Sequence, residues 1–499
     1  MKHTLAFLLS IAALPLFSTT FHVAVSGSNA NNGLSLATAW ATIQHGANTA
    51  VAGDTVLVHP GNYQGLAAMS NSGTATDPIV FLAEAGVQIT SPCSYNNLDG
   101  INVENVSWVV IEGFMVNDMP RTGIRTVLSE HVTIRWNSCH SNYKWGILTG
   151  FAEHVLIEHN ACSGSEDEHG IYVSNSADHP IIRYNHCFGN RSNGIHMNGD
   201  VSLGGDGVIS NAQVYGNTIH GNGVGGGSGI NCDGVTNSVF YNNLLYDNHA
   251  SGISLYRIDG GAPSTGNRVF NNTIINASDA RWCVNITETC TGNQVINNIL
   301  INQHPWRGSI VVAASALPGF VSDHNIATSR FSPDGDATIL TLANWQALGY
   351  DANSAVAAPQ AQLFLSPGSD FHALSGSSQQ CNTGSAAVSS VVQDDLEGTS
   401  RPQGGAYDIG CYESLFGATG IAPSGASTST FTLLGDAVLV HADEPSLLRV
   451  SDSSGRMLLV KRVGAGATRI DLPGNGLLLI EMVGTDGRSI AAMRAAVLP

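Results

Sequence analysis

The sequence predicts an all-β protein whose main body is a parallel β-solenoid, in which the chain winds through successive coils of short strands. Two observations carry this prediction. A short pattern recurs between residues 130 and 302: a β-branched or aromatic residue, two variable positions, an asparagine, one variable position, and then Cys, Ile or Leu. Most copies are accompanied by a second β segment that begins with Gly-Ile, without a helical period. Units of this kind stack as a solenoid.

The composition excludes several other classes of protein. Asp, Glu, Lys and Arg make up 12% of the 499 residues, against about 25% in an average soluble domain. Apolar residues make up 43% and there are 56 glycines, so neither a disordered chain nor a helical array fits. The net charge of -18 argues against a nucleic-acid partner, because such binding depends on Lys and Arg.

Residues 1–20 are predicted to be a secretory signal peptide. A basic start precedes an apolar run over residues 5–17 and then small residues, with cleavage expected near Thr20. The run is too short to cross a bilayer, and no later stretch reaches the roughly 18 apolar residues that a spanning helix needs. We therefore expect an exported protein, secreted or at the cell surface, with no transmembrane segment.

The repeat asparagines are expected to form a ladder. Stacked Asn side chains hydrogen-bond from one coil to the next, and Asn tolerates the left-handed backbone of a sharp corner. Successive gaps are 23, 25, 32, 26, 29 and 26 residues. The ladder positions are Asn137, Asn160, Asn185, Asn217, Asn243, Asn272 and Asn298.

The same register assigns two further columns. Cys139, Cys162 and Cys187 occupy the position that aliphatic residues fill in later coils, so they are predicted to be packing thiols in the core, with a disulfide as the alternative. The nine cysteines are far apart and include no CxxC pair. An outward column is expected to form a charge ladder on the surface, worth about 0–1 kcal/mol per pair. It consists of Arg135, Glu158 and Arg183.

The repeat resembles that of secreted right-handed parallel β-helix proteins, the architecture shared by pectate lyases, alginate and chondroitin lyases, mannuronan epimerases and several polysaccharide hydrolases. Two flanking blocks support the resemblance, which covers residues 21–414. Residues 21–65 are similar to the N-terminal cap and first coil of that group, with a short helix around residues 40–50 over the open end of the core. Residues 370–414 are similar to its final coils. The resemblance implies this fold, a polysaccharide partner and no single activity.

The composition changes after residue 414. Residues 415–430 are rich in Gly, Ala, Ser and Thr and are predicted to be a linker. Residues 431–499 alternate apolar and polar positions between turns, which predicts a small β-sandwich. With the Gly-Arg turn at Gly455 and a later Gly-bearing strand, this segment resembles the C-terminal sorting domain of type IX secretion substrates. That resemblance implies the export and cell-surface attachment machinery as a partner.

The Gly-Ile segments predict where chemistry is placed. Residues alternate inward and outward along a strand, so polar residues beside the inward isoleucines share one outward face over about four coils. Stacked residues on adjacent coils lie about 5 Å apart. Six residues on this face are candidate catalytic groups: Lys144, His169, His196, Asp233, Tyr256 and Arg257. Four are candidate substrate-binding groups: Trp145, Tyr172, Asn198 and Asn231. Three are candidate ligands of Ca²⁺: Asp167, Glu168 and Asp200.

Proton abstraction at C5 of a uronate, followed by β-elimination or re-protonation, is the first reaction that these residue types fit. Arg257 would bind the sugar carboxylate. His169 or His196 would act as base, and Tyr256 or Tyr172 as acid. Acidic side chains would supply oxygen ligands to Ca²⁺, the one cofactor that the sequence suggests.

Lys144 is the only lysine between residues 3 and 460, so a lysine base in the solenoid has to be this residue. An ion pair with Glu168 on the neighbouring coil explains it equally well.

Two alternatives remain open at this stage. Hydrolysis of a glycosidic bond by two carboxylates would use Asp200 with Asp233, or Glu168 with Asp200. The other alternative is a non-catalytic polysaccharide-binding or adhesion protein, in which the same face holds sugars without transforming them.

Overall fold

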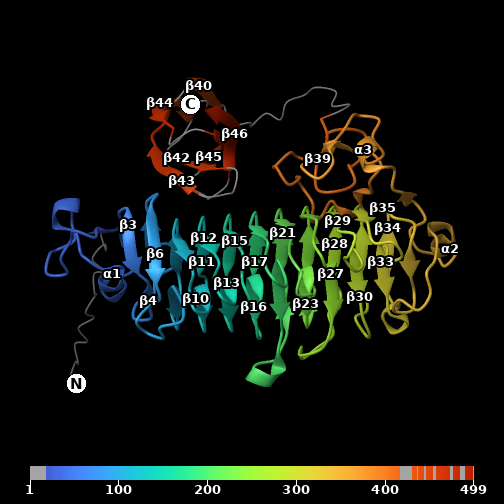
Figure 1. The fold of residues 1–499 in the computed structure, drawn as a ribbon, viewed down its shortest axis with the longest axis horizontal. Helices are drawn as coiled ribbons and strands as arrows, with labels where there is room; N and C mark the ends of the chain where they lie inside the picture. The colour runs from blue at the N-terminus through green and yellow to red at the C-terminus, as the bar shows by residue number, and fades with distance from the viewer. Residues whose placement is uncertain are drawn as a thin grey trace, which may run out of the picture.

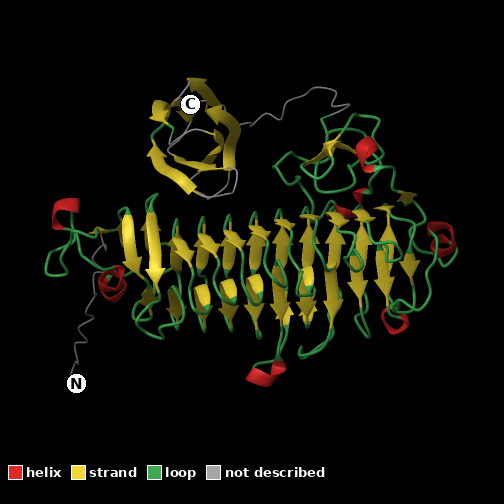
Figure 2. Cartoon of the chain, in the orientation of Figure 1, coloured by secondary structure: helices red, strands yellow, loops and turns green. Residues whose placement is uncertain are grey.

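The computed structural model describes residues 18–415, 430–434, 437–442, 446–452, 457–472, 476–483 and 489–497. These residues form a long parallel β-solenoid and a pair of antiparallel sheets near the C-terminus (Figure 1). Strands dominate, and the few helices are short (Figure 2). The all-β prediction is therefore confirmed. Most of the predicted signal peptide and linker lies outside the described residues.

Three parallel sheets, named A, B and C here, run the length of the solenoid. Sheet A has β1 (Thr20–Val23), β2 (Thr55–Val58), β5 (Ile79–Ala83), β8 (Val109–Glu112), β11 (Thr133–Arg135), β14 (Leu156–Glu158), β17 (Ile181–Arg183), β21 (Gln213–Tyr215), β25 (Val239–Tyr241), β28 (Arg268–Phe270), β31 (Gln294–Ile296) and β34 (Val321–Asp323). Sheet B has β3 (Gly61–Gln64), β6 (Val87–Ser91), β9 (Met115–Asn117), β12 (Ser138–His140), β15 (Ala161–Ser163), β18 (His186–Phe188), β22 (Thr218–His220), β26 (Leu244–Tyr246), β29 (Thr273–Asn276), β32 (Ile299–Asn302), β35 (Ile326–Ala327) and β37 (Ala355–Val356). Sheet C has β4 (Leu66–Ala68), β7 (Ile101–Glu104), β10 (Thr122–Val127), β13 (Trp145–Gly150), β16 (His169–Ser174), β19 (Ile195–Asn198), β23 (Ser228–Asp233), β27 (Ser251–Tyr256), β30 (Val284–Ile286), β33 (Ile310–Val312) and β36 (Phe331–Ser332).

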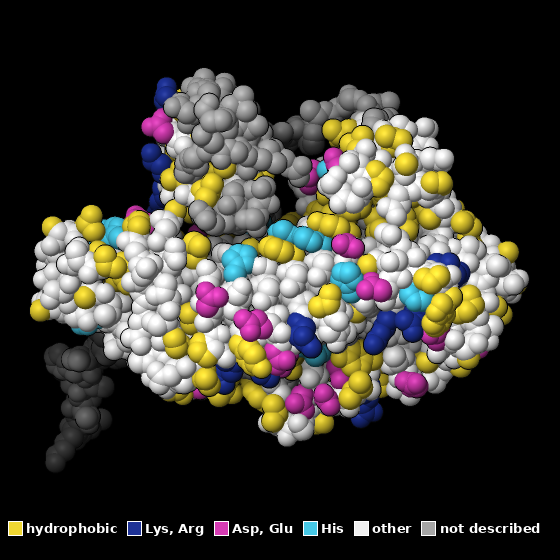
Figure 3. All heavy atoms as spheres, in the orientation of Figure 1, with side chains coloured by type: hydrophobic (Ala, Val, Ile, Leu, Met, Phe, Trp, Pro, Cys, Tyr) yellow, Lys and Arg dark blue, Asp and Glu magenta, His cyan; other side chains and the backbone are white. Residues whose placement is uncertain are grey.

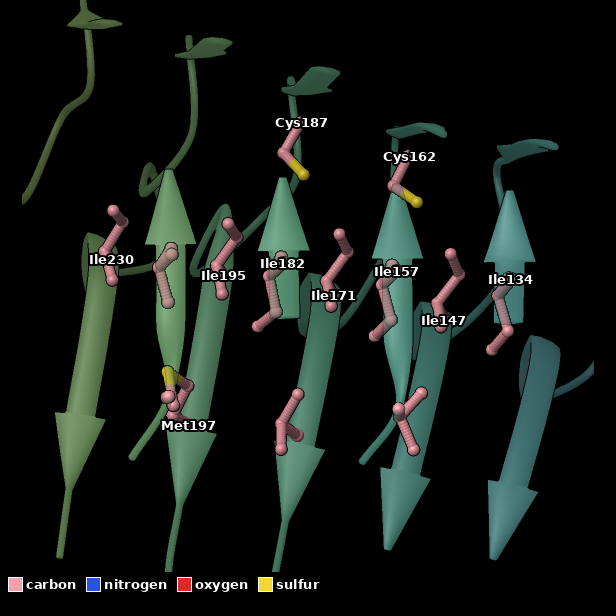
Figure 4. Packing of buried hydrophobic residues seen from close by; sticks show 14 of the residues in the cluster. Ile134, Ile147, Ile157, Cys162, Ile171, Ile182, Cys187, Ile195, Met197 and Ile230 are labelled. Carbon is pink, nitrogen blue, oxygen red and sulfur yellow. The ribbon is translucent and has the colours of Figure 1, made fainter. Parts of the chain in front are cut away.

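The core is a set of inward columns, one residue per coil. Isoleucines from sheets A and C face one another across the interior (Figure 4). The cysteine column is confirmed: Cys139 pairs in register with Cys162, which pairs with Cys187, and Ile219 continues the column. All nine cysteines are buried and free, so the disulfide alternative is wrong.

The asparagine ladder is confirmed at the corner between sheets A and B. Asn137 Nδ2 donates to Asn160 Oδ1 at 3.0 Å and to a main-chain carbonyl of the preceding coil, and the same arrangement recurs along the ladder. One detail of the prediction was wrong. The left-handed residue at each corner precedes the ladder asparagine, as at Trp136, His159 and Tyr184. The ladder positions therefore require Asn for its side-chain hydrogen bonds and not for its backbone, because the left-handed conformation falls on the residue before each ladder asparagine.

Short helices close both ends of the solenoid. At the N-terminal end, α1 (Ile43–Thr49) begins after Thr42, whose hydroxyl accepts from the amide of His45, and it buries Ile43 against the first coils. This confirms the predicted cap. At the other end, α2 (Leu342–Gln346) buries Trp345, whose ring stacks on Phe331.

The segment after β37 does not continue the stack, which differs from the expected final coils. Helix α3 (Gln360–Leu363) and the antiparallel pair β38 (Phe364–Ser366) and β39 (Asp370–Ala373) fold back onto the outer side of sheet B. Leu363, Phe364 and Phe371 pack there against Leu244, Ile275 and Ile299. The reason is an outward apolar patch on these late coils, which this segment buries.

The predicted C-terminal sandwich is present as two antiparallel sheets around one core. One sheet has β40 (Thr430–Leu434), β41 (Ala437–Ala442) and β44 (Gly466–Asp471), and the other has β42 (Ser446–Asp452), β43 (Met457–Val463), β45 (Gly476–Val483) and β46 (Ser489–Val497). Within the described ranges, no helix is long and apolar enough to cross a membrane.

The C-terminal sheets contact the solenoid through Arg449 of β42. Its guanidinium lies 3.7 Å from the ring centre of Trp136 and donates to Glu112 Oε1 at 2.9 Å.

The predicted charge ladder is present. Arg135 pairs with Glu112 and Glu158, and Arg183 pairs with Glu158. It is not a surface ladder, because both carboxylates are almost fully buried.

Candidate functional site

The outward columns of sheet C have the predicted register. Tyr172, His196, Asn231 and Ser254 are successive partners on β16, β19, β23 and β27, and Ser174, Asn198, Asp233 and Tyr256 form the next column. Trp145 and His169 are register partners on β13 and β16, three residues before Leu148 and Tyr172. Most of the molecular face seen in Figure 3 is uncharged, with Lys, Arg, Asp, Glu and His side chains scattered over it.

A chain of hydrogen bonds joins residues on four consecutive coils of this face. His169 Nε2 lies 2.9 Å from His196 Nδ1, and His196 Nε2 lies 3.3 Å from the hydroxyl of Tyr256. Asn231 Nδ2 donates to the same hydroxyl at 2.7 Å. The structure thus brings together the two candidate histidines, one candidate tyrosine and one candidate amide.

Burial keeps these groups in their neutral forms. Loss of solvent lowers the pKa of His196 to about 3 and holds the pKa of His169 well below its ordinary value. Loss of solvent, with the nearby Asp233 carboxylate adding to it, raises the pKa of Tyr256. At neutral pH the chain therefore consists of two uncharged imidazoles and a protonated phenol.

Lys144 and Glu168 form the ion pair that the sequence left open. Lys144 Nζ lies 2.7 Å from Glu168 Oε1, and Trp145 Nε1 donates to the other oxygen at 2.8 Å. The hydrogen bond to Glu168 raises the pKa of Lys144. A lysine held in its charged form is a poor base, so the structure favours an electrostatic role for Lys144.

Two candidate binding residues lie beside the chain. The half-buried ring of Tyr172 stacks between Trp145, at 5.4 Å between centres, and His196, at 5.0 Å. Asn198 Nδ2 donates to the hydroxyl of Tyr172 at 3.2 Å. Among the described residues, Asn198 Oδ1 is buried and has no hydrogen-bond partner.

Asp233 does not serve as an exposed catalytic carboxylate. Its side chain is 1% exposed and accepts hydrogen bonds from the backbone amides of Ile258, Asp259 and Gly260. These bonds hold the loop that follows β27. The sequence shows the acidic column but not the loop that turns its amides onto the Asp233 carboxylate.

Two other candidates lie at the edge of the face. Arg257 follows Tyr256, is exposed, and uses its Nε to donate to the carbonyl of Gly260. Asp200 precedes the short 3₁₀ helix η2 (Val201–Leu203) and accepts from the amide and hydroxyl of Ser202.

The predicted Ca²⁺ ligands do not fit a calcium site. Both oxygens of Glu168 accept from Lys144 and Trp145, and Asp200 is bound to Ser202. Asp167 lies 3.7 Å from the Lys144 ammonium. Across the described residues, no three or more His, Cys, Asp or Glu side chains are grouped to hold a metal ion.

Sequence reasoning did not single out two residues of the site. Asn193, on the turn before β19, donates its backbone and side-chain N–H groups to His169 Nδ1. Arg125 stands two coils before Tyr172 in the same outward column and pairs with Glu104. Asn193 directly precedes Gly194-Ile195, just as His169 directly precedes Gly170-Ile171. This equivalence in the repeat is the sequence signal that could have identified Asn193.

The amino-acid sequence was compared with protein-family models and with curated proteins. A family model described as periplasmic copper-binding protein (NosD) matches residues 47–249, which is less than half of the chain. The search of curated proteins found no match.

Several solved structures are similar to this chain. A pectate lyase, Pel9A, is 17% identical, with 80% of this chain and 97% of that chain covered and a TM-score of 0.49. A rhamnogalacturonan lyase is 14% identical, with 70% and 91% covered and a TM-score of 0.47. An alginate lyase from Paenibacillus sp. str. FPU-7 is 16% identical, with 58% and 97% covered and a TM-score of 0.41. At such identities, activity has to be argued from the side chains of this chain.

Proposed function

We propose that the protein is a secreted carbohydrate-active enzyme that removes the C5 proton of a uronate in a polysaccharide, as a lyase or a C5-epimerase. The observation that supports this most is the pair of neutral histidines joined to Tyr256 on an outward face of the solenoid. Chemistry at C5 of a uronate consists of proton transfers, and a positioned phenol with neutral imidazoles behind it is suited to them.

In the lyase form, Tyr256 both gives and takes a proton. Its phenol proton passes to O4 of the departing sugar while the C4–O4 bond breaks. The C5–H electron pair forms the C4=C5 double bond, and the C5 proton returns to the phenolate oxygen. Asn231, and His196 at 3.3 Å, face that oxygen and stabilise the charge that develops on it. In the epimerase form the C4–O4 bond stays intact and no leaving group takes the phenol proton. Tyr256 then gives its proton to C5 from its own side, and solvent takes the original C5 proton from the opposite side.

The surrounding residues suit a sugar acid. Arg257, exposed beside Tyr256, supplies a guanidinium for the carboxylate, which also makes the C5 proton more acidic. Trp145 and Tyr172 offer apolar ring surface on the same face of the solenoid.

The two-carboxylate hydrolase is less well supported. Hydrolysis needs one carboxylic acid and one carboxylate on opposite sides of the glycosidic bond. Asp233 is bound by loop amides, and Glu168 is bound by Lys144 and Trp145. Neither is available without breaking the surrounding structure.

A polysaccharide screen tests the proposal. The purified protein is incubated with alginate, pectate and glycosaminoglycans, with and without Ca²⁺, while the ultraviolet absorbance of unsaturated uronates is followed. A lyase produces that absorbance, and an epimerase exchanges the C5 hydrogen with solvent deuterium without it. New reducing ends without either signal would identify a hydrolase. Retention on the polysaccharide without any product would identify a binding protein, and either outcome contradicts the proposal.

We also propose that residues 431–499 act as a sorting domain for type IX secretion. Their described strands form two sheets with a core of their own, as an appended domain requires. Deleting residues 431–499 should leave the solenoid in the periplasmic fraction, whereas the full chain reaches the surface or medium. Unchanged export of the deletion variant would contradict this.

A further inference from the structure

We propose that Asn193 is a positioning residue that fixes the tautomers of His169 and His196, and so directs the phenol proton of Tyr256 outward to the substrate. The inference rests on the proposed function for its catalytic meaning. Its structural content concerns which ring nitrogens carry protons, which is measurable without any substrate.

The argument begins at the backbone, where donor roles are unambiguous. Ser228 donates its amide N–H to Asn193 Oδ1 at 2.6 Å, which fixes the orientation of the Asn193 amide. Asn193 Nδ2 therefore points its N–H toward His169 Nδ1, at 3.1 Å. The backbone N–H of Asn193 donates to the same nitrogen at 3.4 Å. Two donors meet at Nδ1, so this atom is an acceptor and carries no proton.

The remaining protons follow in order. A neutral imidazole with a bare Nδ1 carries its proton on Nε2. His169 Nε2 thus donates to His196 Nδ1 across 2.9 Å, which leaves the proton of His196 on its own Nε2. His196 Nε2 then donates to the Tyr256 hydroxyl, which also accepts from Asn231. With two donors at its oxygen, Tyr256 directs its O–H away from the protein.

The opposite arrangement would change the chemistry. If His169 carried its proton on Nδ1, every bond in the chain would reverse, and Tyr256 would donate to His196 Nε2. The phenol proton would then point into the protein, and the phenolate would lose the His196 donor. Asn193 prevents this without approaching the substrate. The charged groups facing His169 are Lys144 and Glu168, and neither lies at Nδ1.

Asn193 is itself held rigidly. It is 3% exposed, and the neighbouring Gly227 leaves room for it: a Cβ at Gly227 would lie 2.2 Å from Asn193 Oδ1. Gly226 has the same backbone φ of +102°, but a Cβ there meets nothing within 4 Å. The two glycines therefore form a matched pair, in which one substitution displaces Asn193 and the other only adds the same backbone strain.

Neutron diffraction of deuterium-exchanged crystals of the full-length protein reads the chain directly. We expect deuterium on Nε2 of His169 and His196, and none on Nδ1 of either. In Asn193→Asp the introduced carboxylate keeps the bond to Ser228 and accepts from His169, so deuterium should move to Nδ1. A deuteron on His169 Nδ1 in the unsubstituted protein, or no deuteron on His169 Nδ1 in Asn193→Asp, would overturn the inference.

Kinetics supply the second readout. Asn193→Asp should lower kcat by about 10²-fold with KM unchanged, in the range of a lost proton-transfer group. Gly227→Ala should lower kcat at least tenfold more than Gly226→Ala, and equal effects would contradict a role for Asn193. If the unsubstituted protein transforms no uronate polymer, the proposed function fails, while the neutron maps still decide whether Asn193 sets the tautomers.

Discussion

At the scale of single residues, the site depends on neutral groups more than on charges. Its two histidines are uncharged because water is excluded from them, and its lysine is charged because Glu168 holds it. The residue types were visible in the sequence, but their protonation was not, because protonation depends on burial and on partners from neighbouring coils. His196 illustrates this: on an exposed strand it would titrate near neutral pH.

Tyr256→Phe should lower kcat by about 10²–10⁴-fold, because the phenol oxygen is the proposed proton carrier. The ring is retained, so the fold should survive, as checked by circular dichroism. Product formation on the active polysaccharide measures the effect. Tyr246→Phe, on sheet B, is the matched control and should keep full activity. Undiminished activity of Tyr256→Phe would remove Tyr256 from the mechanism.

His372 provides a pH-dependent prediction away from the site. The hydrogen bonds that His372 donates to the carboxylates of Glu397 and Asp370 raise the pKa of His372 to about 9. Because the folded-state pKa lies above the unfolded value, His372 stabilises the fold fully below about pH 6.5, and this contribution is lost as the pH rises through about 9. An NMR titration should place the pKa well above that of ordinary histidine, and Glu397→Gln should lower it. A pKa near 6.5 in the unsubstituted protein would contradict the geometry.

At the scale of elements, the corner between sheets A and B is the most regular part of the molecule. The ladder and the core columns followed from sequence spacing, because each coil repeats the same inward positions. The loop at Ile258–Gly260 did not follow, since no repeat constrains it, and it converts Asp233 from a candidate acid into a loop support. The segment around β38 and β39 also differed, because its packing partner is the outside of sheet B.

Asn243→Ala tests the ladder. Asn243 is fully buried, donates to Val214 O and Asn272 Oδ1, and accepts from the amide of Asn217. Each buried group left without a partner costs about 1–3 kcal/mol, so the free energy of unfolding should fall by at least about 2 kcal/mol in denaturant titration. Asn62→Ala, at an exposed position of β3, should change it by less than about 0.5 kcal/mol. Equal effects would show that the ladder is not stabilising.

At the scale of the whole molecule, the C-terminal sheets dock on the solenoid away from sheet C. Their contact runs through the buried Arg449, which the sequence analysis did not select, because nothing in the spacing links β42 to residues more than 300 positions earlier. Arg449 also explains why the Glu112 end of the charge ladder is buried rather than exposed. Figure 1 shows these sheets beside the coils of β11 and β12.

Arg449→Ala should release the C-terminal sheets from the solenoid. The substitution removes the contact with the Trp136 ring and the bond to Glu112. Small-angle X-ray scattering should report a larger radius of gyration, and limited proteolysis should cut the connecting segment faster. Arg462→Ala, at an exposed position of β43, should leave both unchanged. Identical scattering of the two variants would show that other contacts hold the sheets in place.

The two helical ends carry a further consequence. A stack of equivalent coils is a one-dimensional crystal: each layer offers the next the same bonding pattern, and nothing within a layer sets how many will follow. The number of coils is set by α1 and α2, which cover the apolar ends of the stack where a further coil would otherwise bind. Length is thus encoded at the ends, so a whole coil can be added or removed beyond the coils of β13 to β27 without changing the contacts between coils that build the site.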